Sequence, residues 1–236
     1  MRRHIVILVA GLLLSIAGTR AQDSPEYLLE LGAGVGVMTY VGDLNGNLLR
    51  QMQPMGGVVA KYKPTPRVAW AGKLNVGQLK GSSTNVETYY PVTTTNPIEF
   101  KTALVDFDVT FEYNFWAFGT GREYHGARSF TPYIALGAGL SFASADVKGP
   151  NPEKKSAVGF QLPIGVGVKY KVAERLNLSA QWMMHFTGTD KIDGLADPYG
   201  IKSSGLFKNT DGYATLQVAL TYDLWAKCKT CHNDRD

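Results

Sequence analysis

The sequence predicts an all-β fold: an eight-stranded antiparallel transmembrane β-barrel, preceded by an N-terminal signal peptide. Three observations support this prediction. The chain opens with a short apolar leader, about eight later segments alternate apolar and polar residues, and no segment after the leader is apolar enough for a spanning helix. Within hydrocarbon, only helices and closed barrels satisfy every backbone N–H and C=O group. A barrel is the architecture that remains.

The leader is residues 1–21. Arg2 and Arg3 precede an apolar core, and Thr19-Arg20-Ala21 resembles a small-x-small cleavage site, so we expect the mature chain to start at Gln22. The alternative, an uncleaved anchor, is disfavoured because the core is too short to span a bilayer. The leader holds three arginines and no acid, so its removal lowers the formal charge from +4 to +1. Such a balanced chain offers no electrostatic case for nucleic-acid binding.

Strict alternation identifies the strands. From Phe107 to Phe115 every second residue is apolar and those between are polar, which is the period of a strand with two opposite faces. Turn signals and alternation together predict eight strands, at Leu28–Val41, Met55–Tyr62, Val68–Leu79, Thr102–Phe115, Thr131–Ala145, Ala157–Tyr170, Leu176–Phe186 and Tyr213–Trp225.

The connections alternate in length. Two are short, Lys63–Arg67 and Lys171–Arg175, and a middling one is Trp116–Phe130. Outer-membrane barrels place short turns and both termini at the periplasmic rim and long loops outside. We therefore expect an elaborated periplasmic rim at Trp116–Phe130, and long outer loops at Gly42–Pro54, Lys80–Lys101, Val147–Ser156 and Thr187–Gly212.

Small residues on the polar face indicate which face is inside. A soluble eight-stranded barrel of the lipocalin kind shows the same alternation, but its solvated face has no need of glycine, whereas the lumen of a narrow barrel has little room. The polar face carries Gly32, Gly34, Gly36, Gly137, Gly139, Ser141, Gly165 and Gly167. The apolar face carries aromatic residues suited to membrane girdles: Tyr62, Trp70, Tyr113, Tyr170, Trp182, Tyr222 and Trp225.

The polar face also carries charges of both signs: Glu30, Lys61, Lys73, Asp106, Asp108, Glu112, Lys169 and Asp223. Clustered carboxylates can serve acid–base catalysis. We favour ion pairing inside a plugged lumen, because an isolated buried charge is costly. The four histidines show no metal-ligand spacing and no nucleophile–base arrangement is visible, so we predict no catalytic, cofactor-binding or metal-binding residues and no enzyme activity. Calcium binding by loop acids such as Asp43, Asp190, Asp193 and Asp197 is a less favoured alternative.

The chain ends with a tail, residues 226–236, that we expect in the periplasm. Cys228 and Cys231 are candidate disulfide partners in an oxidising compartment. With His232 they also match the C-x-x-C-H pattern of covalent haem attachment. Only four residues follow that pattern, too few to build a haem pocket, so the disulfide is favoured. Whether the tail is frayed or docks a partner stays open.

The middling connection holds candidate docking residues. Aromatic residues and arginine are enriched where proteins bind partners. On that ground we predict that the periplasmic rim docks a partner through Trp116, Phe118, Arg122, Tyr124 and Arg128. The alternative is an ordinary turn whose aromatic side chains pack against the membrane interface.

Five motifs follow one another along the chain. The first is Leu31 to Leu44, with its Y-x-G-D turn at Tyr40 to Asp43. The others are Arg67–Gly81, Phe130–Tyr133 with Gly137–Gly139, Pro163–Tyr170, and Thr189–Gly194. Taken in this order, the five motifs resemble those of a known family, the PorG-type outer-membrane barrels of Bacteroidetes. The Cys228–His232 tail is not part of the resemblance.

The resemblance implies a function as well as a fold. It implies a non-enzymatic barrel of the cell outer membrane that belongs to the type IX secretion system. There it would anchor or stabilise the periplasmic ring, built by a lipoprotein and its partner subunit. The expected domains are a signal peptide at 1–21, a barrel at 22–225 and a tail at 226–236. The alternative is a free-standing surface barrel that binds a ligand or matrix through its outer loops.

Overall fold

Eight long strands make up the part of the chain that the computed structural model describes, residues 25–42, 51–82, 99–120, 127–148, 153–189, 192 and 211–226. All eight predicted strands are confirmed, with ends that differ from the predicted ones by at most four residues. They are β1 (Tyr27–Val41), β2 (Gln53–Thr65), β3 (Val68–Ser82), β4 (Glu99–Asn114), β5 (Phe130–Lys148), β6 (Glu153–Ala173), β7 (Leu176–Thr187) and β8 (Gly212–Ala226).

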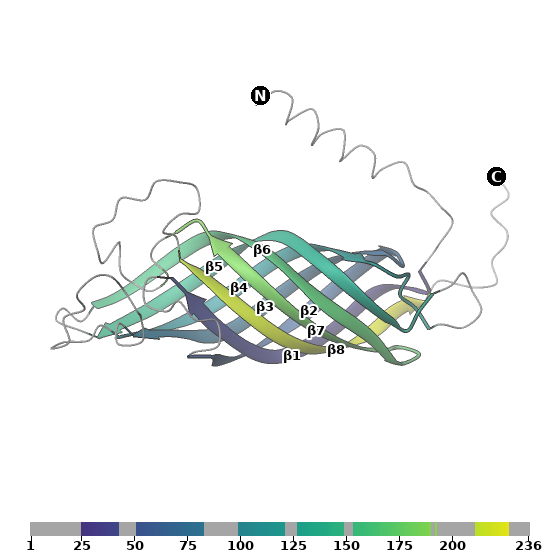
Figure 1. Ribbon diagram of the computed structural model, residues 1–236, viewed down its shortest axis with the longest axis horizontal. Coiled ribbons are helices and arrows are strands. Elements are labelled where there is room, and N and C mark those ends of the chain that lie inside the picture. Colours follow the sequence, from purple (N-terminus) through teal and green to yellow (C-terminus); the bar gives the residue numbers. More distant parts are fainter. Residues whose placement is uncertain are drawn as a thin grey trace, which may run out of the picture.

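The strands close into one antiparallel barrel in sequence order. Each strand pairs with its neighbours along the chain, and β1 pairs with β8 from Tyr27↔Ala226 to Val41↔Gly212 to complete the ring. Closure leaves no unpaired strand edge, which is the condition for crossing a lipid bilayer with strands. The start of β1 and the end of β8 lie at the same end of the barrel, the right-hand end in Figure 1.

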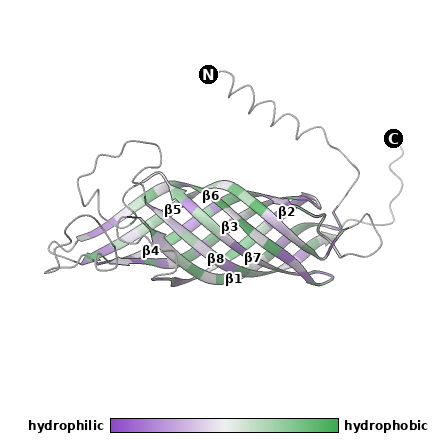
Figure 2. Cartoon of the chain, viewed as in Figure 1, coloured by the Kyte–Doolittle hydropathy of each residue, from purple (hydrophilic) through white to green (hydrophobic). Residues whose placement is uncertain are grey.

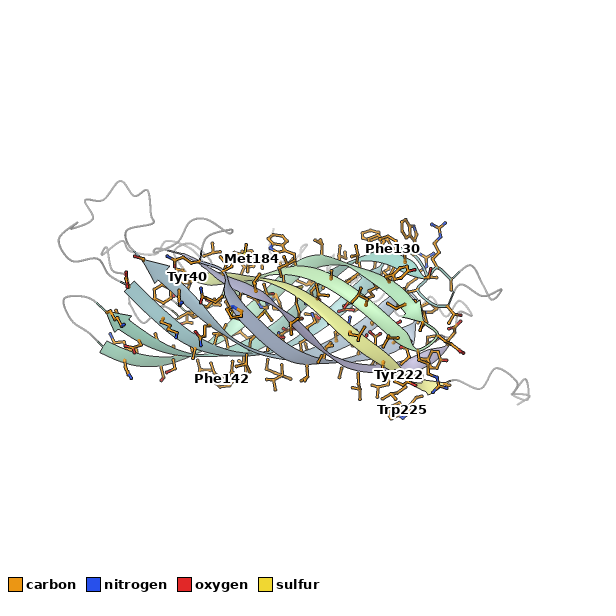
Figure 3. The ribbon with its side chains drawn as sticks, turned by 90° about the horizontal axis from the view of Figure 1, so that it is seen from below. Tyr40, Phe130, Phe142, Met184, Tyr222 and Trp225 are labelled. Atoms are coloured by element: carbon orange, nitrogen blue, oxygen red, sulfur yellow. The ribbon has the colours of Figure 1, made fainter. Side chains whose placement is uncertain are left out.

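The apolar face points outward, as predicted. Apolar and polar residues alternate along the strands (Figure 2), and labelled apolar side chains such as Phe142 and Trp225 project away from the wall (Figure 3). Val109 is 42% exposed and Ile164 is 46% exposed, although both are apolar. So many exposed apolar residues in one continuous belt require a nonaqueous surrounding. The barrel therefore presents a lipid-facing surface.

No helix among the described residues has the length and apolar composition needed to cross a membrane.

The predicted aromatic residues are all at least one-third exposed on this outer surface. Most lie near the end where β1 starts: Trp70 stacks edge-on against Phe111, with ring centroids 5.3 Å apart, and Tyr62 lies opposite Trp70 in the sheet. Trp182 is the exception, since it lies in the middle of β7. Apart from Trp182, the predicted aromatic residues thus form one dense girdle at the end where β1 starts, which is the periplasmic end of an outer-membrane barrel.

Charged side chains form two layers in the periplasmic half of the lumen. In the layer nearest the periplasm, the Lys63 ammonium contacts both Glu30, at 3.4 Å, and Asp223. In the next layer, the Glu112 carboxylate accepts Lys61 at 3.4 Å and Lys169 at 2.7 Å. The predicted pairing of lumen charges is confirmed for these residues. Lys169 also lies 4.5 Å from the centre of the Tyr133 ring, a cation–π distance.

Two lumen lysines, Lys63 and Lys171, belong to the predicted short turns and instead lie in strands. β2 runs to Thr65 and β6 to Ala173, each with a register shift just before its turn. Because the alternation of Lys61 and Lys169 continues by two residues in each strand, both side chains face the lumen, where Lys171 lies 2.7 Å from Asp223. Turn signals locate the turns but cannot show that pairing continues through a bulge.

The outer end of the lumen is apolar, which alternation does not predict. Ten buried residues form one cluster there: Met38, Tyr40, Met55, Leu79, Phe100, Leu104, Ala143, Val147, Ile192 and Tyr213. Tyr40 and Phe100 meet edge-to-face at 4.8 Å. Apart from Ile192, which follows β7, these residues occupy inward positions of strands whose midsections carry polar groups on the same face. The cluster thus forms an apolar layer between the polar middle of the lumen and its outer end.

Candidate functional site at the periplasmic rim

The connection between β4 and β5 is anchored to the barrel at both of its ends. Next to the strand, the Phe115 N–H donates to the carbonyl of Pro132. Farther out, Phe118 and Arg128 form an isolated parallel bridge, and the Phe118 N–H donates to the Pro66 carbonyl at 3.0 Å in the neighbouring β2–β3 turn. The predicted elaboration of the periplasmic rim is therefore an ordered shelf, defined here as residues 115–120 and 127–130.

Phe118 faces the lumen side of this shelf. It is only 8% exposed, and its ring lies 5.8 Å from the Lys171 ammonium. The Tyr27 ring lies 5.4 Å from the same ammonium. The Thr120 hydroxyl of the shelf also donates a hydrogen bond to the Glu26 carboxylate at 2.5 Å, which connects the shelf to the residue just before β1. Phe118 and Tyr27 thus cover the innermost charged layer of the lumen.

Trp116 and Arg128 form the exposed part of the shelf. The Arg128 guanidinium lies over the Trp116 ring, 5.0 Å from its centre, and the ring is 39% exposed. Phe130 tilts against Trp116 at 5.9 Å and points outward at the same end of the barrel (Figure 3). A guanidinium stacked on an indole presents both a flat apolar surface and N–H donors. Such pairs suit the recognition of a protein partner.

The predicted docking residues are therefore only partly placed. The structure brings Trp116 and Arg128 together and buries Phe118 beneath them. Arg122 and Tyr124 lie outside the described residues, as do Cys228 and Cys231 of the candidate disulfide.

At the opposite rim, the Tyr40-x-Gly42 motif has a packing role. The Tyr40 hydroxyl donates to the Asp211 carboxylate, which joins the end of β1 to the start of β8. A Cβ atom at Gly42 would lie 2.3 Å from that same tyrosine hydroxyl. Glycine is needed because the chain passes directly over the tyrosine tip.

A third group, in the middle of the lumen, contains possible metal-ligating atoms that spacing along the sequence does not reveal. Asp106, Asp108 and His185 place one ligand atom each within 4.8 Å of one another. The His185 ring nitrogens already contact Gln161 at 3.0 Å and Thr215 at 3.2 Å, while the Lys73 ammonium lies 3.9 Å from Asp108. The lysine supplies positive charge to these carboxylates, so the group is an internal polar network. The two aspartates lie on β4 and the histidine on β7, which explains why spacing along the chain gives no signal.

Comparison with solved structures identifies the fold. Neisserial surface protein A (NspA) matches with a TM-score of 0.50 and 15% sequence identity, covering 83% of this chain and 97% of that chain. A major outer membrane protein from Thermus thermophilus has a TM-score of 0.46 and 15% identity, covering 83% and 99%. The N-terminal β-barrel domain of OprF from Pseudomonas aeruginosa has 0.45 and 12%, covering 86% and 100%. Identities this low show a shared fold alone, that of outer-membrane barrels.

Comparison with protein sequences identifies the family. No curated protein matches the chain. Residues 3–233, nearly the whole chain, match the model of a family described as a domain of unknown function, DUF6089. The chain therefore belongs to the DUF6089 family.

Proposed function

We propose that this protein is a non-enzymatic outer-membrane component of the type IX secretion system that anchors or stabilises the periplasmic ring. The observation that carries the proposal is the exposed Trp116–Arg128 pair on an ordered shelf at the periplasmic rim. The lipid-facing belt and the single aromatic girdle support a membrane setting in which this shelf faces the periplasm.

The closed lumen favours an anchor over a conduit. Two layers of ion pairs, a central polar network and an outer apolar cluster occupy the barrel from one mouth to the other. An eight-stranded barrel has an interior that side chains just fill. A protein substrate has no path through such a barrel, so a role in secretion would depend on its surfaces.

The motifs shared with the PorG-type barrels support a common barrel interior. A Cβ atom at Gly167 would lie 2.6 Å from the Tyr133 ring, and Lys169 lies over the same ring. Tyr133 belongs to the Phe130–Tyr133 motif, and Gly167 and Lys169 belong to the Pro163–Tyr170 motif. Two separate motifs of the resemblance thus pack on one another. Ring anchoring, by contrast, is expected of the exposed shelf.

The test is crosslinked pull-down from intact envelopes of cells that express the full chain. Trp116→Ala with Arg128→Ala removes the exposed pair and should reduce recovery of the ring lipoprotein and its partner about tenfold, since hot-spot truncations commonly cost more than about 1 kcal/mol each. The matched control is Trp70→Ala with Arg175→Ala, which removes the same residue types from the same end of the barrel. Heat-modifiable migration on gels shows that each variant is folded.

The outcomes separate the alternatives. Loss of ring subunits in the Trp116–Arg128 variant, with normal recovery in the control, supports the proposal. Normal recovery in both would place the contact outside the shelf. If the unmodified chain recovers no ring subunit, the free-standing surface barrel becomes the better description.

A further inference from the structure

The outward face of β3–β6 changes character in three successive rows towards the outer rim. Residues paired across the strands form an apolar row, then a small polar row, then a charged row. In strand order the rows are Val76, Val105, Phe142 and Val158; then Gln78, Ala103, Ser144 and Ser156; then Lys80, Lys101, Asp146 and Lys154. All four residues of the apolar row are exposed, so the row belongs to the lipid-facing belt. The charged row therefore lies just beyond the hydrocarbon, at headgroup level.

The charged row has an excess of positive charge that the protein does not neutralise. Lys80 and Lys101 are direct cross-strand partners, which places like charges opposite each other. Such pairs destabilise a sheet because their Cβ atoms are about 5 Å apart. Asp146 lies opposite both Lys101 and Lys154, and its carboxylate forms its ion pair with Lys154, at 3.9 Å. Among the described residues, neither Lys80 nor Lys101 forms an ion pair, and the carboxylate opposite Lys101, that of Asp146, is engaged by Lys154.

A cavity of about 670 Å³ lies beside these two lysines. Its described lining includes both of them, with Gln51, Gly81, Ser82, Phe100, Asp146 and a second lysine–acid pair, Glu99 and Lys148, which face each other across β4 and β5. The described lining carries three lysines and two acids, so a net positive charge remains in the cavity, where Lys80 and Lys101 lie opposite each other.

We propose that Lys80 and Lys101 bind a phosphate group of a phosphorylated glycolipid in the outer leaflet of the membrane. An anion between two opposed ammonium groups turns their repulsion into attraction, and lysine is a common phosphate ligand. The position favours a lipid over a free anion. Lys101 is four residues from lipid-facing Val105, about 13 Å along the strand, so a lipid whose chains pack on the belt has its headgroup at the lysines.

This proposal rests on the outer-membrane placement of the barrel and not on ring anchoring. The lysines lie at the outer rim, whereas the shelf with Trp116 and Arg128 lies at the periplasmic end. A lipid-binding measurement on the purified protein tests the lysine site, and pull-down of ring subunits tests ring anchoring by the shelf. Either can fail without the other.

The test measures lipid A binding to the purified mature chain, folded in mild detergent, by titration under native mass spectrometry. Lys80→Gln with Lys101→Gln should weaken binding about tenfold or more, because both phosphate contacts are lost. Lys80→Arg with Lys101→Arg should retain binding. Lys155→Gln removes one positive charge from the same end of the barrel and leaves the Asp146–Lys154 pair intact, so it should have a much smaller effect than Lys101→Gln alone.

Two further arms identify the ligand source. Dephosphorylated lipid A should bind the unmodified chain as weakly as intact lipid A binds the Lys80→Gln, Lys101→Gln variant. Inorganic phosphate that binds as tightly as lipid A, and displaces it, would overturn the lipid assignment. Equal lipid A affinity in the unmodified chain and the folded Lys80→Gln, Lys101→Gln variant, or equal loss in Lys101→Gln and Lys155→Gln, would overturn the site itself. Heat-modifiable migration confirms folding, and Lys101→Gln alone serves if the double variant does not fold.

Discussion

Glu112 shows what a single residue does inside this barrel. Its carboxylate is fully buried and is shared by two lysines from different strands, Lys61 on β2 and Lys169 on β6. One acid thus ties together three strands that are not consecutive in the ring. The neighbouring layer repeats the arrangement, with Asp223 shared between Lys63 and Lys171.

Removal of this shared charge should be strongly destabilising. Glu112→Gln leaves two buried ammonium groups facing a neutral amide, and should lower the free energy of unfolding by about 3 to 5 kcal/mol, the cost typical of a broken buried ion pair. Urea unfolding of the protein in lipid vesicles measures the change. Glu174→Gln, at an exposed position beside the β6–β7 turn, is the control and should change stability by about 0.5 kcal/mol or less. Equal effects at the two positions would mean that the lumen is hydrated and weakly coupled.

β4 shows the same logic for a whole element. Its inward side chains, such as Asp106 and Glu112, are fully buried, whereas Phe107 and Val109 on its outward face are 47% and 42% exposed. A strand with these two faces is stable only where one side is dry because it is packed and the other is dry because it meets lipid. The outward row ends in aromatic residues, with Tyr113 and Phe115 edge-to-face at 6.0 Å.

Charge on the outward face of β4 should be costly in proportion to depth. Val109 lies in the middle of the outward row from Ala103 to Phe115, so Val109→Arg should destabilise the barrel by about 2 to 4 kcal/mol. Tyr113→Arg places the charge closer to the aromatic girdle, and this charge should destabilise the barrel by only about 1 kcal/mol. Unfolding in vesicles measures both. A flat profile along the strand would contradict the position of the belt.

The molecule as a whole is a closed barrel with a different surface at each end. The periplasmic end carries the aromatic girdle and the shelf, and the outer end carries the apolar cluster and the charged row. Between the two ends, buried side chains occupy the lumen, and both binding surfaces that we propose lie on the rims.

The filled lumen predicts that the barrel does not conduct ions. Purified protein in planar bilayers should show no stable, large single-channel steps, because paired charges and the apolar cluster leave no continuous water path. Steady channels of uniform size, from protein shown to be folded by heat-modifiable migration, would mean that the apolar cluster opens in a bilayer.

Much of this architecture could be predicted from sequence, because a strand in contact with both lipid and lumen must alternate with a period of two. The run from Phe107 to Phe115 assigns both faces of β4 correctly, and small residues such as Gly137 identify the lumen side. Two kinds of feature could not be predicted from alternation and turn signals. Strand pairing in β2 and β6 continues past the predicted ends, so that Lys63 and Lys171 also face inward, and the outer lumen is apolar at residues such as Phe100.

The sequence by itself determined the number of strands, their order and which face meets lipid, since these follow from periodicity and turn chemistry along the chain. Only the tertiary structure decided which groups meet. The register between strands places Lys80 opposite Lys101 and the Lys169 ammonium over the Tyr133 ring. It also brings Asp106 and Asp108 of β4 close to His185 of β7. The physical reason is that a closed barrel couples residues far apart in the chain through pairing and shear, and alternation carries no information about either.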